Sequence, residues 1–248
     1  MAAFFFSDVH LGLGTRMKEK AKEDRLLAFL DAVRPEADQL FIVGDLFDFW
    51  FEYATVIPRG FHRTLTALQA FSDAGKPVHY LTGNHDCWMG DFFETEIGAI
   101  LHTDPFEISI QEKRVFIHHG DGLAENDTGY RLIKPVLRNP IAIRAYRWLH
   151  PDIGVRLARG TSRTSRDFTA SKHYGEELGM LRHAEQLIAA GAQIVIMGHH
   201  HQPSRVDAGG GVYVNLGDWI TYNTYGVMEN GVIELRTWNA HPEVMHDG

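Results

Sequence analysis

The run Leu40-Phe41-Ile42-Val43-Gly44-Asp45-Leu46-Phe47-Asp48 decides how the rest of the chain is interpreted. Its first four residues are apolar, as in a strand that is buried on both faces of a parallel sheet. The strand ends at an acid, and sites in open α/β sheets form at the carboxyl ends of the strands. We therefore expect Asp45 to stand in a site, where its carboxylate could be shared by two metal ions.

Four other polar clusters also follow short apolar runs. The apolar runs are Ala3 to Phe6, Val78 to Leu81, Val115 to Ile117 and Ile194 to Met197. The clusters that follow them are Ser7-Asp8-Val9-His10, Gly83-Asn84-His85-Asp86, His118-His119-Gly120-Asp121 and Gly198-His199-His200-His201. Five strands that all end in Asp, Asn or His predict one polynuclear metal centre at a common edge.

The segments between these strands show helical periodicity. Apolar residues recur at helical spacing in three sets, which are Leu26, Leu27, Leu30 and Val33, then Phe61, Leu65, Leu68 and Phe71, then Leu178, Leu181, Ala184 and Ile188. Short strands are expected from Ile100 to Ile117 and from Ser204 to Trp238, with Gly209-Gly210-Gly211 and Asn230-Gly231 as turns. The rhythm breaks at about 126–174. We therefore predict an α/β protein with a single domain over 1–248 and an inserted helical lid at about 126–174.

Composition narrows the class of protein. The 248 residues are 44% hydrophobic, which is enough for a full core, and no apolar run reaches the ~20 residues that span a bilayer. A formal net charge of -8 disfavours nucleic-acid binding through bulk charge. Cys87 is the only cysteine and the first residues lack a basic signal region, so a reducing cytoplasmic location is expected. Many of the 15 histidines stand beside acids and glycines, which favours metal binding.

Each pair of candidate ligands is weak evidence by itself. Asp8 and His10 lie two residues apart, so on an extended backbone their side chains can point to the same side and chelate one ion. A turn acid beside a surface histidine is the ordinary alternative. His199 and His201 share this spacing, and Gly198 would let the backbone pass close to a ligand. The specific signal is the order of all five clusters along one chain.

That order, Asp-x-His, Gly-Asp-x-x-Asp, Gly-Asn-His-Asp, His-Gly and Gly-His-x-His, closely resembles the calcineurin-like metallophosphoesterase superfamily. The resemblance implies a four-layer α/β/β/α sandwich with two divalent metal ions. One ion would bind Asp8, His10 and His201, the other would bind Asn84, His119 and His199, and Asp45 would bridge them. Carboxylate, amide and imidazole ligands without thiolate suit Mn(II), with Fe, Zn or Co as alternatives.

Two further residues receive catalytic roles from the same resemblance. His85 would lie over the substrate phosphate, where it could stabilise the transition state or protonate the leaving oxygen. Asp48 would hold the His85 ring, although a helix N-cap or turn acid is the alternative for this residue. His118 and His200 stand next to ligands on the chain and are expected to point away from the metals.

The segment from Tyr130 to Lys172 is strongly basic inside an acidic chain. It holds ten Lys or Arg residues against two acids, Asp152 and Asp167, which is a local formal charge of +8. Apolar residues such as Ile141, Trp148 and Ile153 alternate with the basic ones. This pattern favours an amphipathic lid that covers acyl chains and meets an anionic membrane surface. An ordinary solvated helix pair, with its apolar face packed on the core, is the alternative.

A narrower resemblance is carried by His119-Gly120-Asp121-Gly122-Leu123, by Asp127 and Gly129-Tyr130, and by the Ser/Arg-rich stretch Arg159 to Arg166. These features look like the UDP-2,3-diacylglucosamine hydrolases of lipid A biosynthesis, which are peripheral enzymes of the inner membrane. The resemblance implies water attack on the α-phosphorus of an acylated UDP-sugar, which gives UMP and 2,3-diacylglucosamine 1-phosphate. It also implies substrate contacts, at Asp127, Arg159 and Ser162, with Arg163 or Arg166 as replacements.

Two other functions stay open at this point. A soluble metallophosphodiesterase or nucleotide pyrophosphatase would use every metal ligand, but it would have a polar lid, and aromatic and basic residues are not interleaved here as base stacking requires. A non-catalytic scaffold of the same fold is disfavoured, because all seven ligands and His85 are present. His85 follows the general superfamily pattern, whereas the best-known branch of the hydrolases has Arg there.

Overall fold

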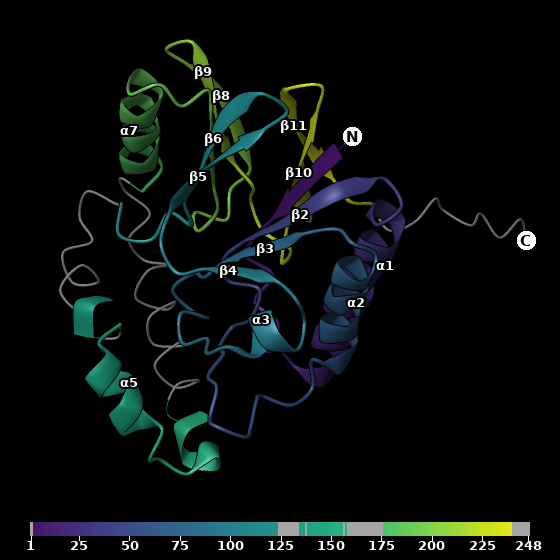
Figure 1. Cartoon of the computed structure of the whole chain (residues 1–248), viewed down its shortest axis with the longest axis vertical. Coiled ribbons are helices and arrows are strands. Elements are labelled where there is room, and N and C mark those ends of the chain that lie inside the picture. The colour runs from purple at the N-terminus through teal and green to yellow at the C-terminus, as the bar shows by residue number, and fades with distance from the viewer. Residues whose placement is uncertain (1, 124–133, 137, 156, 158–175, 240–248) are drawn as a thin grey trace, which may run out of the picture.

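A computed structural model of the chain describes residues 2–123, 134–136, 138–155, 157 and 176–239. In this part of the chain two sheets lie face to face (Figure 1). The first has the strand order β11-β10-β1-β2-β3-β4 and the second the order β5-β6-β7-β9-β8. The strands are β1 (Ala2–Phe6), β2 (Ala37–Val43), β3 (Val78–Leu81), β4 (Ile100–His102), β5 (Phe106–Ile110), β6 (Lys113–Ile117), β7 (Ile194–Met197), β8 (Ser204–Ala208), β9 (Gly211–Asn215), β10 (Thr224–Glu229) and β11 (Val232–Thr237).

Each sheet contains a group of neighbouring parallel strands. In the first sheet β1, β2, β3 and β4 are parallel neighbours, and β10 joins β1 antiparallel. In the second sheet β6, β7 and β9 are parallel, with β5 and β8 antiparallel at the edges. All five strands predicted before polar clusters are present, and β3 and β7 have the predicted bounds. Their carboxyl ends therefore meet at one edge of the two sheets.

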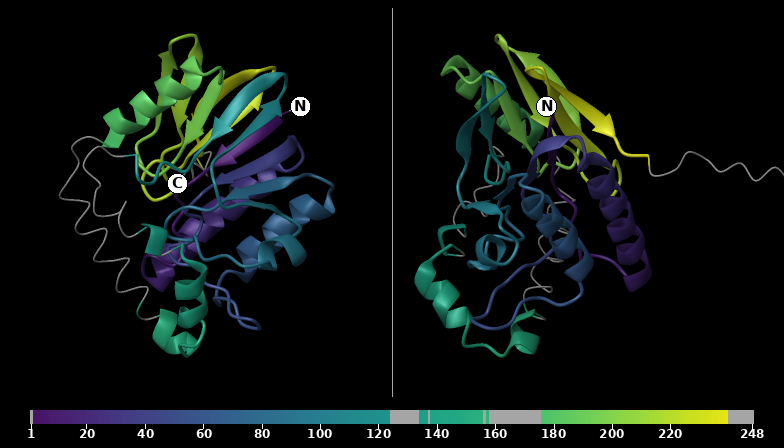
Figure 2. Two further views of the ribbon diagram at one scale, coloured as in Figure 1. Left: turned by 60° about the vertical axis from the view of Figure 1, so that its left-hand side comes forward. Right: turned by 45° about the vertical axis from the view of Figure 1, so that its right-hand side comes forward.

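Helices cover the outer faces of the sheets. Helices α1 (Arg16–Val33) and α2 (His62–Asp73) pack on the first sheet, and α7 (Glu176–Ala189) packs on the second. The short α3 (Phe92–Thr95) lies near β4, and α5 (Pro140–Tyr146) lies apart from both sheets (Figure 2). The sequence of layers is helix, sheet, sheet, helix, which confirms the predicted four-layer α/β/β/α sandwich.

Three apolar clusters fill the three spaces between these layers. The space between the sheets holds Phe5 and Phe41, which stack with ring centroids 4.6 Å apart, together with Ile117, Ile196 and Val214 from the second sheet. Burial of each such side chain contributes about 1.5–3 kcal/mol. Because every second residue of β1 enters this space and the others face α1, all five β1 residues are buried, as the apolar run predicted.

Helix α7 shows one departure from its predicted face. Leu178 is 48% exposed, although its spacing placed it with the apolar residues. Met180, Ala184 and Ile188 are the buried residues, and they recur every four positions along one side of the helix. Leu178 is two positions from Met180, so it lies on the opposite side of the helix at about 100° per residue.

Both predicted hairpin turns are present. Asn230 and Gly231 join β10 to β11 with φ of 51° and 76°, as a two-residue type I′ turn requires. Gly209 and Gly210 join β8 to β9 with φ of 58° and 98°. These turns fix the register of two antiparallel pairs.

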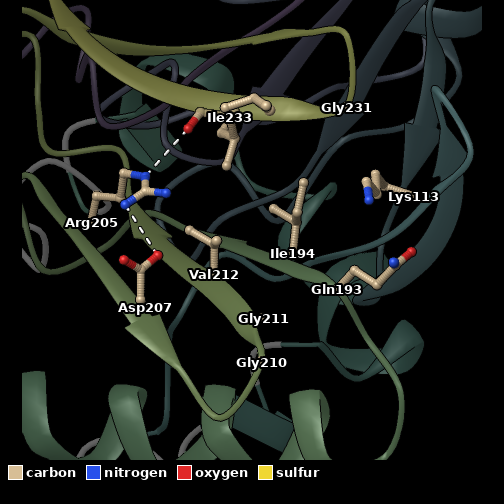
Figure 3. Close-up of a pocket in the computed structure, with 11 residues that line it drawn as sticks. Lys113, Gln193, Ile194, Arg205, Asp207, Gly210, Gly211, Val212, Gly231 and Ile233 are labelled. Carbon is tan, nitrogen blue, oxygen red and sulfur yellow. Dashed lines mark hydrogen bonds and ion pairs between the residues drawn. The ribbon is translucent and has the colours of Figure 1, made fainter.

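A cavity of about 410 Å³ opens at the amino ends of β7 and β9 and is lined by Gln193, Gly210 and Gly211 (Figure 3). The Arg205 guanidinium on its wall donates to the Ile233 carbonyl and pairs with Asp207 at 3.2 Å. This cavity lies at the amino ends of the strands, whereas the polar clusters follow their carboxyl ends. It therefore takes no part in the site described below.

Candidate metal centre

The seven predicted ligands come together where the carboxyl ends of the two sheets converge. Asp8 and His10 follow β1, Asp45 follows β2, and Asn84 follows β3. His119 follows β6, and His199 and His201 follow β7. Backbone bonds tie these loops together, because the amides of Asp8 and His10 donate to the carbonyls of Gly44 and Asp45. The parallel strands thus bring residues from five separate parts of the chain to one place.

Asp8, His10 and His201 form the first group of candidate ligands. One donor atom from each lies within 4.8 Å of the other two. The Asp8 Oδ1 atom is 3.7 Å from His10 Nε2 and 3.6 Å from His201 Nε2. Asp8 and His10 are buried, whereas His201 is half-buried and borders the open side of the site.

Asp45, His119 and His199 form the second group. Their donor atoms also lie within 4.8 Å of one another. His119 Nε2 is 3.2 Å from both Asp45 Oδ2 and Asn84 Oδ1, so Asn84 lies beside this group. Asp45 Oδ2 is also 3.7 Å from His10 Nε2. Asp45 is therefore within reach of both groups, which is the arrangement that a shared ligand requires.

The ligand loops use an unusual backbone conformation. Asp8, His10, Asp45, His199 and His201 all have positive φ, between 49° and 68°. A residue other than glycine in this left-handed region costs about 1 kcal/mol or more, and such costs are concentrated at functional sites. The paired ligands of each Asp-x-His or His-x-His motif thus converge through left-handed turns and not on the extended backbone that their spacing predicted.

Glycines allow these loops to pass close to one another. A Cβ atom on Gly198 would lie 2.5 Å from Asp8 Oδ2, and one on Gly83 would lie 2.1 Å from Asp45 Oδ1. The predicted close approach at Gly198 is therefore present. Glycine is required at both positions because any side chain would displace a candidate ligand.

The donor set fits divalent metal ions. Among the described residues, Asp8 Oδ1 and both ring nitrogens of His10 are buried atoms without a hydrogen-bond partner. Such orphaned polar atoms are costly unless something else binds them. Oxygen and imidazole donors in two overlapping groups suit a pair of first-row divalent ions. The residues present are thus able to hold the two ions that the motifs imply.

Electrostatics point to the same conclusion. Burial lowers the pKa of His10, but Asp48 and Asp8 outweigh this effect and raise it to about 9. Burial also opposes a charge on His119, yet Asp45 raises its pKa to about 10. In the reverse direction, the pKa of Asp45 is held well below its usual value by His119 and His85, against the effect of burial. The buried carboxylates thus stabilise positive charge at this place, and bound metal ions would provide that charge.

His85 lies beside the first group and contacts Asp48 in two ways. Its Nδ1 atom is 3.1 Å from the Asp48 backbone carbonyl and 3.8 Å from Asp48 Oδ1. The same Oδ1 atom is 3.7 Å from His10 Nδ1, so Asp48 stands between the two imidazoles. Burial lowers the pKa of His85 to about 4, although Asp45 and Asp48 act in the opposite direction. Asp48 lies in a loop, so it does not cap a helix.

His118 has a structural place outside the ligand groups. Its Nδ1 atom accepts a hydrogen bond from the Gly120 amide, and its ring lies 5.9 Å from the ring of His183. Burial lowers the pKa of His118 to about 3, so the ring is neutral. This is the outward orientation that strand alternation predicted. His200 likewise does not join either ligand group in the described part of the chain.

Two neighbours of the site were missed by the sequence argument. Asp218 Oδ2 lies 3.2 Å from His201 Nδ1, and Lys22 Nζ donates to the His10 carbonyl. A signal for Asp218 exists, because Leu216-Gly217-Asp218 follows the apolar residues of β9 just as Gly44-Asp45 follows those of β2. Lys22 lies on α1 and carries no motif, so only the packing of α1 reveals it.

The predicted substrate contacts Asp127, Arg159, Ser162, Arg163 and Arg166 lie outside the described residues. Part of the proposed lid is described. Tyr146 of α5 packs against Phe51 and Trp88 with ring centroids 4.7 and 4.9 Å away. Lys134 pairs with Asp121, two residues past His119, at 2.7 Å. These contacts fasten the described part of the lid to the loops that carry the site.

The outward side of this segment is apolar and basic. Trp148 is 91% exposed, Ile141 78% and Ile153 59%, and Arg144 and Arg147 are also exposed. The alternative in which the apolar face simply packs on the core therefore does not hold for these three side chains. None of the described helices is long and apolar enough to cross a membrane.

Comparison with known proteins gives a consistent family. The model of the calcineurin-like phosphoesterase family matches residues 1–203. A UDP-2,3-diacylglucosamine hydrolase of Porphyromonas gingivalis is 33% identical over 94% of this chain and 96% of its own length. One from Nitrosococcus oceani is 31% identical over 88% of each chain. Among solved structures, Yfce, a phosphoesterase from E. coli, covers 96% of this chain and 94% of its own, with 17% identity and a TM-score of 0.49.

Proposed function

Because the chain belongs to the calcineurin-like phosphoesterase family, we propose that it is the metal-dependent hydrolase that cleaves the pyrophosphate of UDP-2,3-diacylglucosamine in lipid A biosynthesis. The products would be UMP and 2,3-diacylglucosamine 1-phosphate. The observation that carries this choice of substrate is the full-length similarity to hydrolases of that name. The metal ligands are common to many phosphoesterases, so they alone do not select a substrate.

We propose two divalent ions, with Mn(II) as the native metal. Asp8, His10 and His201 would hold one ion, Asn84, His119 and His199 the other, and Asp45 both. The chemistry that such a pair supplies is activation of water near neutral pH and neutralisation of phosphoryl oxygens. The chain itself would supply the donor geometry, because five of the seven candidate ligands stand in left-handed turns of the loops that leave the two sheets.

His85 would handle a proton during the reaction. The Asp48 carbonyl fixes its Nδ1 atom as a hydrogen-bond donor, so Nε2 is the atom that gains or loses a proton. His85 can protonate a leaving oxygen only when it is doubly protonated, and burial opposes this by lowering its pKa to about 4. The negative charge of a bound pyrophosphate would raise that pKa again. Asp48, beside both His85 and His10, would keep the two rings in position.

We propose that residues of about 126–174 form a lid that shelters the acyl chains and associates peripherally with the anionic inner-membrane surface. The exposed Trp148, Ile141 and Ile153 support this, because three large apolar side chains stand exposed within one short segment, and exposed apolar surface can serve as an interaction site. Arg144 and Arg147 on the same segment add the positive charge that anionic lipids attract. Asp127, Arg159, Ser162, Arg163 and Arg166 would contact the substrate.

The substrate is tested by comparing three compounds in the presence of Mn(II). UDP-2,3-diacylglucosamine, the deacylated UDP-sugar and bis(p-nitrophenyl) phosphate are assayed with EDTA as the control. Fast release of UMP that depends on the acyl chains supports the proposal. Turnover of only the small ester would retain a metallophosphodiesterase and refute the lipid substrate.

The membrane proposal has its own matched pair of variants. Trp148→Ser removes the most exposed aromatic side chain of the lid, and Met17→Ser removes an 82% exposed apolar side chain on α1. We expect Trp148→Ser alone to weaken sedimentation with vesicles that contain anionic phosphatidylglycerol. Equal binding by both variants and by the wild-type chain contradicts a membrane role for this surface.

A further inference from the structure

The loop after β9 is the part of the metal centre that the motifs leave out. β9 pairs in parallel with β7, the strand that leads to His199 and His201, so its carboxyl end reaches the same edge. The Leu216 amide extends this pairing by donating to the Met197 carbonyl at 2.8 Å. Asp218 follows two residues later and is 3% exposed. A sixth strand end therefore brings a buried carboxylate to the site.

The two oxygens of Asp218 have different partners. Oδ1 accepts hydrogen bonds from the backbone amides of Ile220, Thr221 and Tyr222 at 3.2, 2.7 and 3.0 Å. Oδ2 lies 3.2 Å from His201 Nδ1. The first oxygen thus closes the loop, and the second is directed at a candidate metal ligand.

The His201 ring connects Asp218 to the ligand group. Its Nδ1 atom faces Asp218, while its Nε2 atom is 3.6 Å from Asp8 Oδ1. The neighbouring Trp219 amide donates to the Asp8 carbonyl at 3.1 Å. The loop is thereby joined to the first ligand group through two consecutive residues, because Asp218 faces His201 and Trp219 binds Asp8.

We propose that Asp218 is a positioning residue that holds the proton of His201 on Nδ1, which leaves the Nε2 lone pair directed at the metal. A carboxylate only accepts hydrogen bonds, so the ring nitrogen facing it must carry the proton. Partners of this kind fix the tautomer and orientation of a metal-binding histidine and increase its basicity. The inference rests on the proposed metal centre, but not on the identity of the substrate.

His119 shows the same principle with a different partner. Its Nδ1 atom lies 2.9 Å from the Val43 carbonyl, and its Nε2 atom faces Asp45 and Asn84. A carbonyl sets the tautomer of His119 without adding charge, whereas Asp218 sets that of His201 with a full negative charge. His201 is also the more exposed ligand, at 36% of its side chain, so it has less packing to hold its ring.

Asp218→Asn separates the two functions of the carboxylate. The three backbone amides require an oxygen, so the amide oxygen of Asn would keep the place of Oδ1, and its NH2 group would face His201. A donor in that place demands the opposite tautomer, with the proton on Nε2, where it blocks the metal. The loop should therefore stay folded while metal binding suffers.

The experiment measures Mn(II) binding to the metal-free full-length chain by calorimetry, without substrate. We expect Asp218→Asn to weaken binding of one ion about 10–100-fold, which is the usual effect of removing such a partner. Asp207→Asn, at an exposed acid of β8, is the matched control and should bind as the wild-type chain does. Wild-type affinity in Asp218→Asn overturns the proposal.

Nitrogen-15 NMR of the metal-free wild-type chain supplies a second test that needs no substitution. The proposal requires that the neutral ring of His201 carries its proton on Nδ1, so the spectrum is recorded at a pH where the ring is neutral. A neutral ring that carries its proton on Nε2 overturns the proposal even if Asp218→Asn fails to fold. Because both measurements omit the UDP-sugar, failure of the lipid substrate would leave this inference standing. Failure of the inference would equally leave the substrate proposal intact.

Discussion

Replacement of Gly83 by alanine should remove both metal ions from the site. Gly83 is not among the glycines with positive φ, so the expected effect of alanine is steric. The added Cβ would lie 2.1 Å from Asp45 Oδ1 and 2.7 Å from the Asp45 backbone nitrogen. Ordinary contacts of a Cβ atom begin at 3.4 Å, so Asp45 or the backbone must move by about 1 Å.

Such a movement is large on the scale of metal coordination. Distances from ligand to metal are fixed to within about 0.2 Å, and the carboxylate that moves is the one within reach of both groups. Asp45 cannot turn aside freely, because Oδ1 accepts the His85 amide at 2.9 Å. We therefore expect a loss of metal affinity beyond the ~10–100-fold effect of losing an outer contact.

The assay is metal content after dialysis against a range of free Mn(II), together with hydrolysis of bis(p-nitrophenyl) phosphate. Gly226→Ala on β10 is the matched control, because its Cβ would meet the movable ends of Leu216 and Ile233 at 3.1 and 3.3 Å, away from the ligands. Circular dichroism establishes that both variants fold. Two ions bound by Gly83→Ala with wild-type affinity would refute the reasoning.

Other predictions test separate parts of the site and the core. Asp45→Ala should lose both ions and all turnover, whereas His85→Ala should keep its metal and lose rate. Metal content and steady-state kinetics of the two variants test this. Retained turnover in Asp45→Ala, or loss of metal in His85→Ala, would contradict the roles proposed for these residues. Removal of metal by EDTA should abolish hydrolysis and added Mn(II) should restore it, so full activity in EDTA argues against metal dependence. Burial lowers the pKa of His79 to about 4. Between pH 6.5 and 4 the unfolded chain therefore binds a proton at this residue that the folded chain does not bind. The free energy of unfolding should fall by up to about 2 kcal/mol as the pH drops through this range. Urea unfolding across this range should show a flatter dependence for His79→Gln, and an unchanged slope would contradict the assignment.

Sequence patterns were sufficient to predict the strands and the convergence of the ligands at their carboxyl ends. The apolar runs before Asp45 and Asn84 are short, rich in β-forming residues and bounded by turn residues, and this pattern predicts strands rather than helices. Parallel pairing then brings all carboxyl ends to one edge. The two sheets were implied only by resemblance, because no local pattern tells β6 and β7 to pair with each other and leave the first sheet.

The backbone conformation of the ligand loops could not be predicted from these sequence patterns. Asp8 and His10 were expected on an extended backbone, yet both have positive φ, which depends on contacts with loops that are distant along the chain. The place of Asp48 between two imidazoles depends on those same turns. Spacing predicts which side chains meet, but only tertiary contacts determine which atoms face each other.

The lid shows most clearly why composition could not replace structure. Alternating basic and apolar residues describe equally well a helix packed on the core and one that presents its apolar side outward. Tyr146 packs on Phe51 and Trp88, which uses one side of the segment to anchor it. Trp148, two residues further, consequently points away from that anchor and is 91% exposed. An anchored segment whose other side is apolar gains free energy when an apolar partner covers that side, and acyl chains or a bilayer would do so, which agrees with the proposed lipid substrate.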